Sequence, residues 1–561
     1  MSGTADLVLH SGRVFTGSGL HPSATAVAVT GGRIVAVGTD AQARARTGPR
    51  TRTVDLAGRL LLPGFTDAHV HPVMGGLERL GCDLSEVQGA QAALERVAAH
   101  AAAHPGSGWI SGGGWAMTDF PGGTPRREDL DRVVPDRPVL LLNRDHHGAW
   151  ANSRALELAG VDAGTPDPAD GRIERDADGA PSGTLHEGAM DLVSRLLPPV
   201  TEDDLAAGLA EGQRYLHSAG VTGWQDAIVG NHAGHSDTTP TYLRAAAAGT
   251  LTARVVGALW WPRGRGLDEV EDVVAGFVAH RDRVAAAGTD RFATTSVKIM
   301  LDGVAENRTA SMLTPYLDGC GCSSGDSGLS YLDRDLLLAA VPALDEAGFD
   351  VHVHVIGDRA VRDALDALAL ARRSPASRGG RHHLAHLQVV HPDDVPRFAA
   401  LDVTANVQAL WACEEEQMTA LTTPLLGPER NSWQYPFGGL LRNGARLVMG
   451  SDWPVSTPDP WQAVHVAVNR ALPGQDAPPF FPEQALTLTE ALHAYTAGSA
   501  WINRHEGAGT IAPGAVADLT VASADPFSLD PRDLHAVRTD LTFVSGVPVH
   551  DATAALTGVG R

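Results

Sequence analysis

Two histidines separated by one residue are the first candidates for chemistry in this chain. They end an apolar run, residues 61–72, in the order His69-Val70-His71-Pro72. Side chains two positions apart on a β-strand point to the same side, so both imidazoles would face one space, at the spacing that a metal ion needs for two ligands from one strand. Pro72 cannot donate to a sheet ladder, so the strand should end there. Both histidines would then lie at the carboxyl end of a strand, which is the catalytic end of a parallel α/β barrel.

Further candidate ligands occur at the ends of later strand-like runs. A His-x-His pair alone is a weak signal, because the chain has 24 histidines and repeats the pattern at His352-Val353-His354. The further candidates are Lys298 in the run 294–301, His354 in 350–356, His386 in 382–390 and Asp452 directly after 446–450. Each has an ordinary explanation, since a strand-end histidine is often a core residue and a strand-end aspartate is often a helix cap. Together, at successive strand ends, they would converge on one barrel mouth.

This set of donors fits a divalent metal ion. Imidazole nitrogen and carboxylate oxygen suit zinc and similar ions. An ammonium group has no lone pair, so Lys298 could bind a metal only when neutral or modified. Reaction with carbon dioxide would convert its amine into a carbamate, whose oxygens could bridge two ions. Because a bound ion makes water a hydroxide source near neutral pH, these residues predict hydrolytic chemistry.

The elements that would position these residues alternate along the chain between apolar strand-like runs and helical stretches. The runs are 61–67, 221–229, 254–261, 294–301, 350–356, 382–390, 402–409 and 446–450. Alternating strands and helices imply a parallel sheet, and this number of units suggests a closed barrel. The predicted fold class is therefore α/β, a (β/α)8 TIM-like barrel over residues 61–504.

Two other parts of the chain do not fit the barrel pattern. Short alternating runs broken by glycines occur before and after it, and we expect them to pair into one small β domain, residues 1–60 plus 505–561. The stretch between the first run and Val221 is too long for a loop. We therefore predict an inserted subdomain at about residues 77–215.

Composition argues against two classes of partner. Apolar residues make up 43% of the chain and charged residues 20%, as in soluble globular proteins. With 44 basic and 66 acidic residues the formal charge is −22, which argues against nucleic acid or an anionic membrane as the main partner. The chain has no apolar run long enough to span a membrane and no secretory signal pattern at its N-terminus, so we expect a cytoplasmic protein.

The cysteines predict no disulfide framework. The chain has four, Cys82, Cys320, Cys322 and Cys413, which are too few to staple so long a protein. Cys320-Gly321-Cys322 is spaced too tightly for a structural zinc site and has no second pair, so we interpret it as a loop without a function.

With these residues in place, the whole chain resembles the amidohydrolase superfamily, in particular the branch of metal-dependent hydrolases that includes N-substituted formamide deformylase. The motifs that carry the resemblance are Pro-Gly-Phe-Thr-Asp-Ala-His-Val-His at 63–71, Lys-Ile-Met-Leu-Asp-Gly at 298–303, His-Val-Ile-Gly-Asp-Arg-Ala at 354–360, Ala-His-Leu-Gln-Val-Val at 385–390 and Gly-Ser-Asp-Trp-Pro-Val at 450–455. The resemblance implies one or two divalent ions, most simply zinc. It assigns His69 and His71 to the first ion, His354 and His386 to the second, Lys298 to a carbamate bridge, and Asp452 to metal contact and proton transfer.

The resemblance also marks residues that would bind substrate. Asp145, His147 and Trp150 belong to an insert segment that resembles one lying over the barrel mouth, although Trp150 could equally be a packing residue. Trp115, after three glycines, and Arg308 are weaker candidates of the same kind.

The function that this predicts is hydrolysis of an amide-like C–N bond in a small molecule, such as an N-substituted formamide, by metal-activated hydroxide with Asp452 as proton shuttle. A deaminase of the same superfamily is disfavoured, because no glutamate follows His354 shortly. A lactone or ester hydrolase would use the same ligands. A non-catalytic binding or regulatory protein would be marked by missing ligands, and none is missing. The partners considered are the small-molecule substrate and, as the alternative to a monomer, a second copy of the chain in a homodimer.

Overall fold

The computed structural model describes residues 4–106, 108–232 and 236–554. At its centre lies a sheet of eight strands, each parallel to the next. In order these are β7 (Phe65–Val70), β14 (Val221–Val229), β15 (Arg254–Trp260), β16 (Phe292–Met300), β17 (Asp350–Val355), β18 (His383–His386), β19 (Thr404–Val407) and β20 (Leu447–Met449). The predicted TIM-like (β/α)8 fold is confirmed.

Helices cover the outside of this sheet and alternate with its strands. They include α7 (Glu202–Ser218), α8 (Thr239–Ala247), α9 (Val270–Ala286), α10 (Arg334–Glu346), α11 (Asp358–Arg373), α12 (Val395–Ala400), α14 (Phe437–Arg442) and α15 (Pro460–Asn469). The apolar side chains of helices and strands form one large core between the two layers. Within the described residues, we find no helix whose length and apolar character would let it cross a membrane.

The barrel closes where its last strand meets its first, through residues that follow β20. The amide of Asp452 donates to the carbonyl of His69 at 2.8 Å, and the amide of His71 donates to the carbonyl of Trp453 at 2.8 Å. Gly450 allows the close approach, because a Cβ there would lie 2.6 Å from the backbone nitrogen of His69. The seam is therefore held at the carboxyl end of the strands, at the candidate ligands themselves.

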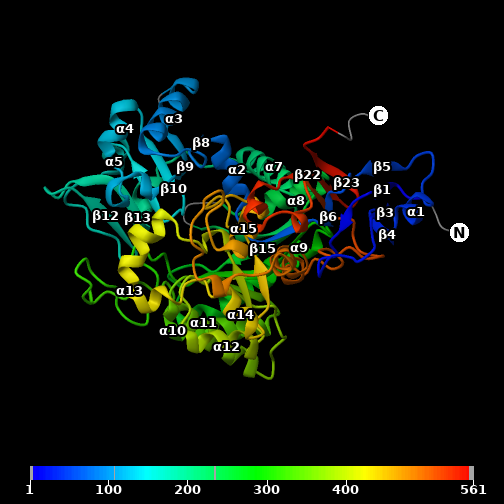
Figure 1. Ribbon diagram of the computed structural model, residues 1–561. Helices are drawn as coiled ribbons and strands as arrows, with labels where there is room; N and C mark the ends of the chain where they lie inside the picture. Colours follow the sequence, from blue (N-terminus) through cyan, green and yellow to red (C-terminus); the bar gives the residue numbers. More distant parts are fainter. Residues whose placement is uncertain (1–3, 107, 233–235, 555–561) are drawn as a thin grey trace.

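Strands from both ends of the chain lie together at one end of the molecule (Figure 1). One sheet contains β4 (Arg33–Gly38), β3 (Ala26–Thr30), β1 (Leu7–His10) and β5 (Arg52–Asp55), in that order. The other contains β2 (Arg13–Val14), β6 (Leu60–Pro63), β21 (Leu519–Ala522), β22 (Thr539–Val544) and β23 (Val547–Asp551). Residues 1–3 and 555–561 of the predicted β domain lie outside the described residues.

The predicted first barrel strand, residues 61–67, needs a correction. The structure divides it between two sheets, because β6 pairs with β21 whereas β7 pairs with β14. The break falls at Gly64, where a Cβ would lie 2.3 Å from the side chain of Thr222. The continuous apolar run hid this change of sheet because both strands are fully buried.

Between α2 (Pro72–Leu80) and α7 the chain forms a separate sheet, at the far end of the molecule from the terminal strands (Figure 1). Its order is β12 (Gly171–Arg175), β13 (Pro181–Glu187), β11 (Gly148–Ala151), β10 (Val139–Asn143), β9 (Ile110–Trp115) and β8 (Cys82–Asp83). Helices α3 (Ala90–Ala103), α4 (Arg127–Val133) and α5 (Ser153–Ala159) pack with it. This segment is called the insert below.

Helix α2 starts directly after His71 and packs unusually closely against α7. A Cβ on Gly76 would lie 1.8 Å from the carbonyl oxygen of Gly208, and a Cβ on Gly212 would lie 2.2 Å from that of Pro72. In both cases the added Cβ would collide with backbone atoms, and no flexible side chain could move away to make room. The contact fixes the first turn of α2 and so the end of β7.

We expect Gly76→Ala to destabilise the protein by about 1–3 kcal/mol, because overpacking a backbone contact forces the two helices apart. The midpoint of guanidinium unfolding should fall accordingly. The matched control is Gly276→Ala on α9, where no atom lies within 4 Å of the added Cβ. That substitution should leave stability unchanged or raise it by about 0.5–1 kcal/mol through helix propensity. Equal midpoints for the two variants would contradict the close contact.

Candidate active site

The side chains of His69, His71 and Asp452 meet at the carboxyl end of the barrel, and all three are buried. Asp452 Oδ1 lies 3.0 Å from His69 Nε2 and 3.0 Å from His71 Nε2. The three potential ligand atoms lie within 4.8 Å of one another. Burial lowers the pKa of both imidazoles, which keeps them in the neutral form that binds metals. Two neutral imidazoles and a carboxylate are a donor set that could hold a divalent ion.

A chain of hydrogen bonds below this cluster determines which nitrogen of His69 carries the proton. His352, in the middle of β17, has its Nδ1 2.5 Å from Gln225 Oε1 and its Nε2 3.0 Å from His69 Nδ1. The amide oxygen can only accept, so His352 Nδ1 donates to it. Burial holds the pKa of His352 well below its usual range, so its ring is neutral and its Nε2 accepts from His69 Nδ1–H. His69 Nε2 is thereby the ring nitrogen that faces Asp452, at 3.0 Å from its Oδ1.

His354 and His386 form a second group beside the first. Their ring centroids are 4.4 Å apart, and the ring of His69 lies 4.8 Å from that of His386. Asp302 Oδ1 lies 3.2 Å from His354 Nδ1, which leaves His354 Nε2 for a ligand. Within the described chain, neither ring nitrogen of His386 has a hydrogen-bond partner, although the ring is buried and stacks on Trp411 at 5.3 Å. A buried imidazole without a hydrogen-bond partner fits a site for a metal ion.

Lys298, on β16, lies beside His69 in the buried interior of the barrel. Its side chain is 2% exposed, and its Nζ is 3.4 Å from His69 Nε2. Burial lowers the pKa of Lys298 to about 7. A large fraction of this amine is therefore neutral at physiological pH, which is the form that can react with carbon dioxide.

Two buried carboxylates beside these ligands have pKa values shifted in opposite directions. Burial alone would raise the pKa of Asp452, but the imidazoles of His69 and His71 outweigh it and hold the pKa well below its usual range. Asp67 is the opposite case, because burial raises its pKa to about 7 even though it accepts hydrogen bonds from Ser451. Asp452 is thus ionised at neutral pH and able to accept a proton. Asp67 has a structural role instead, because it accepts the backbone N–H of Ser451 and so links the first barrel strand to the residues after the last one.

The insert contributes a charged pair to the mouth of the barrel. His147 Nδ1 lies 2.8 Å from Glu187 Oε1, and that oxygen also accepts from Thr309 Oγ1 at 3.0 Å. Burial disfavours the charged imidazole, but Glu187 outweighs it and raises the pKa of His147 to about 9. The ring centroid of His147 lies 6.1 Å from that of His354. A cationic hydrogen-bond donor therefore faces the candidate metal ligands.

The neighbours of His147 have different surroundings. His146 Nε2 lies 3.1 Å from Glu78 Oε1, which raises the pKa of His146 against the effect of burial. Asp145 Oδ1 accepts the backbone N–H of His147 at 2.9 Å and so shapes the turn that presents the imidazole. Arg308 lies in the loop after β16, in the left-handed backbone region with φ of 58°. Of the residues predicted to contact substrate, His147 lies close to His354. Asp145 acts on this position indirectly, because it shapes the turn that presents His147.

Trp115 and Trp150 do not lie at the mouth, and the prediction that they contact substrate needs a correction. Both are buried in the core of the insert, where each packs against Phe120. The indole of Trp115 donates to the carbonyl of Leu141 at 2.9 Å, and that of Trp150 to the carbonyl of Arg126 at 2.8 Å. Their polar and apolar surfaces are already satisfied within the insert, so no face is left for a substrate.

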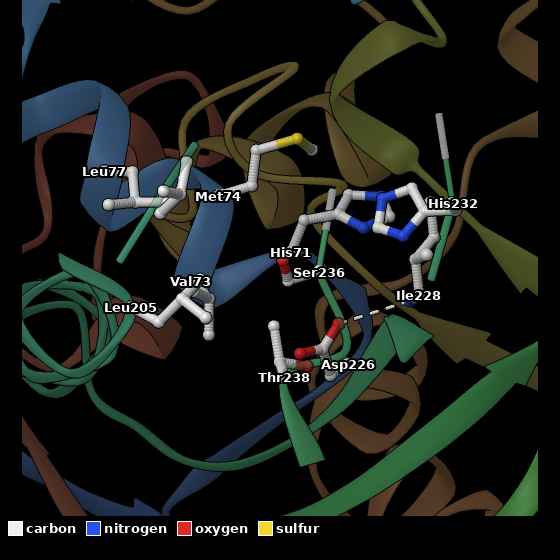
Figure 2. A pocket seen from close by; sticks show the side chains of 11 residues that line it. His71, Val73, Met74, Leu77, Leu205, Asp226, Ile228, His232, Ser236 and Thr238 are labelled. Carbon is white, nitrogen blue, oxygen red and sulfur yellow. Dashed lines mark hydrogen bonds between the residues drawn. The ribbon is translucent and has the colours of Figure 1, made fainter. Parts of the chain in front are cut away.

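A small cavity of about 40 Å³ opens beside His71 (Figure 2). Its wall is mostly apolar and includes Val73, Met74 and Leu77 of α2 and Leu205 of α7. Asp226 of β14 lines its polar side together with His232, Ser236 and Thr238, and the carboxylate of Asp226 already accepts from Tyr242 Oη at 2.7 Å and from the amide of Ile228 at 3.2 Å. The cavity therefore favours a short apolar group over a charged one.

Several residues of this arrangement were not assigned a role from the sequence. His352 had a usable signal, because it lies two residues before His354 on one strand and must point to the same interior. Asp302 belongs to the motif Lys-Ile-Met-Leu-Asp-Gly at 298–303, but the motif assigned it no role. Gln225 and Glu187 gave no local signal, since their partners come from distant parts of the chain.

Comparisons with known proteins agree with this geometry. The amidohydrolase family model matches residues 52–550. YtcJ of Bacillus subtilis, an amidohydrolase by name, is 29% identical and covers 97% of this chain and 99% of its own. N-substituted formamide deformylase of Arthrobacter pascens is 28% identical over 99% of this chain and 100% of its own. The crystal structure of an uncharacterized metal-dependent hydrolase from Pyrococcus furiosus superposes with a TM-score of 0.68, at 25% identity, over 94% of this chain and 99% of that one. The chain therefore belongs to the amidohydrolase family and is a hydrolase of its metal-dependent kind.

Proposed function

We propose that this enzyme hydrolyses an amide-like C–N bond in a small molecule. The observation that carries the proposal is the position of Asp452, whose Oδ1 lies 3.0 Å from both His69 Nε2 and His71 Nε2. An ionised carboxylate within a cluster of neutral imidazoles can contact a metal and also exchange a proton with a reacting group.

The metal would be zinc, in one or two sites. His69, His71 and Asp452 would hold the first ion, and His354 and His386 the second. When bound, such ions supply Lewis acidity, which makes water a nucleophile near neutral pH and polarises a carbonyl group. The neutral amine of Lys298 would react with carbon dioxide to give a carbamate, which would supply oxygen donors for the ions beside His69.

The residues of this chain would then do the following. Asp452 accepts a proton from the attacking water and delivers it to the leaving nitrogen, which needs protonation before the C–N bond can break. His147 is protonated and uses Nδ1 for Glu187, so its Nε2–H remains to hold a substrate oxygen. His352 keeps the lone pair of His69 directed at the mouth.

The substrate class follows from two supports. The Arthrobacter pascens relative is named for N-substituted formamides. The cavity beside His71 has an apolar wall and a volume of about 40 Å³, which would hold a short alkyl substituent. We therefore propose small amides, with N-alkyl formamides first among them.

The proposal is tested with purified protein and a panel of formamides, acetamides and ureas that carry alkyl groups of increasing length. We expect zinc by elemental analysis, release of free amine from short N-alkyl formamides, and loss of activity on chelation that zinc restores. Lactones and phosphotriesters serve as comparison substrates. Faster turnover of these than of every amide, or full activity in metal-free protein, would overturn the proposal.

Two variants should separate proton transfer from metal binding. Asp452→Asn keeps the shape but removes the basic oxygen, so turnover should fall by about 10²–10⁴ while most of the metal is retained by the histidines. Lys298→Ala should lose metal as well as turnover, because it removes the proposed bridge. The measurements are turnover and bound metal on the same preparations. Near-native turnover in Asp452→Asn would show that another group moves the proton, and unchanged metal content in Lys298→Ala would show that the lysine is structural.

The hydrogen-bond chain below the site predicts an effect on metal affinity at a residue that touches no metal. His352→Phe fills the same space but removes the partner of His69 Nδ1, so metal affinity should fall by about 10–100-fold. His382→Phe is the matched control, because His382 is equally buried but its ring contacts Asp345 and the amide of Val351, away from the ligands. Affinities are measured by competition with a chelator. An equal loss in both variants would reduce the role of His352 to general stability.

A further inference from the structure

A hairpin in the loop after β16 carries two cysteines that the proposed hydrolysis does not use. Cys320 Sγ and Cys322 Sγ lie 2.9 Å apart, and both residues are exposed. Sulfurs in a disulfide are about 2.05 Å apart, so the two thiols are already close to bonding distance. The sequence analysis interpreted this segment as a loop without a function, but in the structure the two thiols are in contact.

The backbone of the hairpin builds this approach. Asp318 Oδ1 accepts the amide of Cys320 at 3.0 Å and that of Cys322 at 2.9 Å, and the amide of Asp318 donates to the carbonyl of Cys322 at 2.8 Å. Gly321, between the cysteines, has φ of +76°, a left-handed conformation that L side chains rarely adopt. This reversal brings the two cysteines to one side. Leu317, at the base of the hairpin, donates its amide to the carbonyl of Leu425 at 2.8 Å, which ties the hairpin to α13 (Thr423–Asn431).

The two sulfurs are not equivalent. Cys320 Sγ–H donates to Asp318 Oδ1 at 3.0 Å, and this hydrogen bond raises the pKa of Cys320. Cys320 therefore keeps its proton, whereas Cys322 Sγ has the neighbouring sulfur as its described contact. Because the thiolate is the reactive form and the hydrogen bond to Asp318 holds the proton on Cys320, Cys320 is the poorer first nucleophile and is placed to resolve the product.

The other cysteines provide an internal contrast. Cys82 and Cys413 are buried. Burial raises the pKa of Cys82 to about 12, and it raises the pKa of Cys413 as well. Neither can supply thiolate near neutral pH or meet a reagent from solution, so thiol chemistry of the folded protein is confined to the hairpin.

We propose that Cys320 and Cys322 form a dithiol–disulfide couple that is oxidised by low-molecular-weight disulfides. Cys322 Sγ attacks one sulfur of the small disulfide, whose S–S bond breaks and releases one thiol. Cys320 Sγ then attacks the sulfur of Cys322 in the mixed disulfide, which forms the Cys320–Cys322 bond and releases the second thiol. The two protons of the protein thiols leave with the two released thiols. A small exposed ring of this kind belongs to the labile class of disulfides, which cycle between both states.

The test uses the full-length, metal-loaded protein in buffers of reduced and oxidised glutathione at graded ratios. In the reduced protein we expect iodoacetamide to modify Cys320 and Cys322 and to spare Cys82 and Cys413. After oxidation the mass should fall by two hydrogens with no glutathione retained, and peptide mapping should link Cys320 to Cys322. Cys320→Ser should instead hold one glutathione on Cys322, because the resolving thiol is gone and ring closure is no longer possible.

Two glycine variants test whether the hairpin geometry is responsible. Gly321→Ala keeps both thiols but strains the left-handed position, so the equilibrium constant for ring closure should fall about tenfold. Gly319→Ala is the matched control, because its Cβ also meets open space and its φ is not positive. Stable glutathione adducts at both cysteines, disulfides between two chains, thiols that react only after chelation, or equal constants for the two glycine variants would each overturn the proposal.

Discussion

The seam between the last and the first barrel strand is the constraint on which the active site depends. His69 and Asp452 meet there twice, once through the backbone at 2.8 Å and once through their side chains at 3.0 Å. A barrel can close only if its final strand pairs with its first, so the same bonds that complete the fold also set the separation of two candidate ligands. Gly450 makes this possible, because any side chain would collide with His69. Folding and assembly of the site are therefore one event.

The interior of this barrel is polar where many such barrels are filled with branched apolar side chains. His69, His352 and His383 are buried there, together with Gln225 and Lys298. Buried polar groups cost free energy unless they are hydrogen-bonded, and a linked network orders all its members together. Gln225 is central, because its Oε1 lies 2.5 Å from His352 Nδ1 and 3.1 Å from His383 Nε2. Because Gln225 Oε1 accepts from both rings, it fixes which nitrogen of His352 and of His383 carries the proton. Through His352 it also fixes the protonated nitrogen of the candidate ligand His69.

The repetitive part of the fold and most of the candidate site were predictable from the sequence. Strand-end ligands are readable because a two-residue period and a following proline or glycine place them at one edge of the sheet. What could not be read depends on the register between strands. The pairing of His352 with His69 and of His147 with Glu187 follows only once distant segments are aligned.

Some local patterns also misled for physical reasons. Trp115, after three glycines, was a weaker candidate for a substrate contact, yet these glycines form part of β9, where the absence of side chains lets β8 and β10 approach closely. The tryptophan then fills the core that these strands enclose. The run 61–67 looked like one strand, because hydrophobicity does not reveal at which residue a buried chain leaves one sheet for another.

The division of labour between barrel and insert has a consequence for how such an enzyme can change over evolutionary time. The candidate metal ligands all stand on the barrel, whereas His147 and Glu187 belong to the insert and contact the barrel side through Thr309. Under the proposed function, mutations in the insert would alter which molecules bind without disturbing the groups that would carry out bond cleavage. The sequence of the insert could then change, and with it the substrate specificity, while the candidate metal ligands on the barrel stay the same.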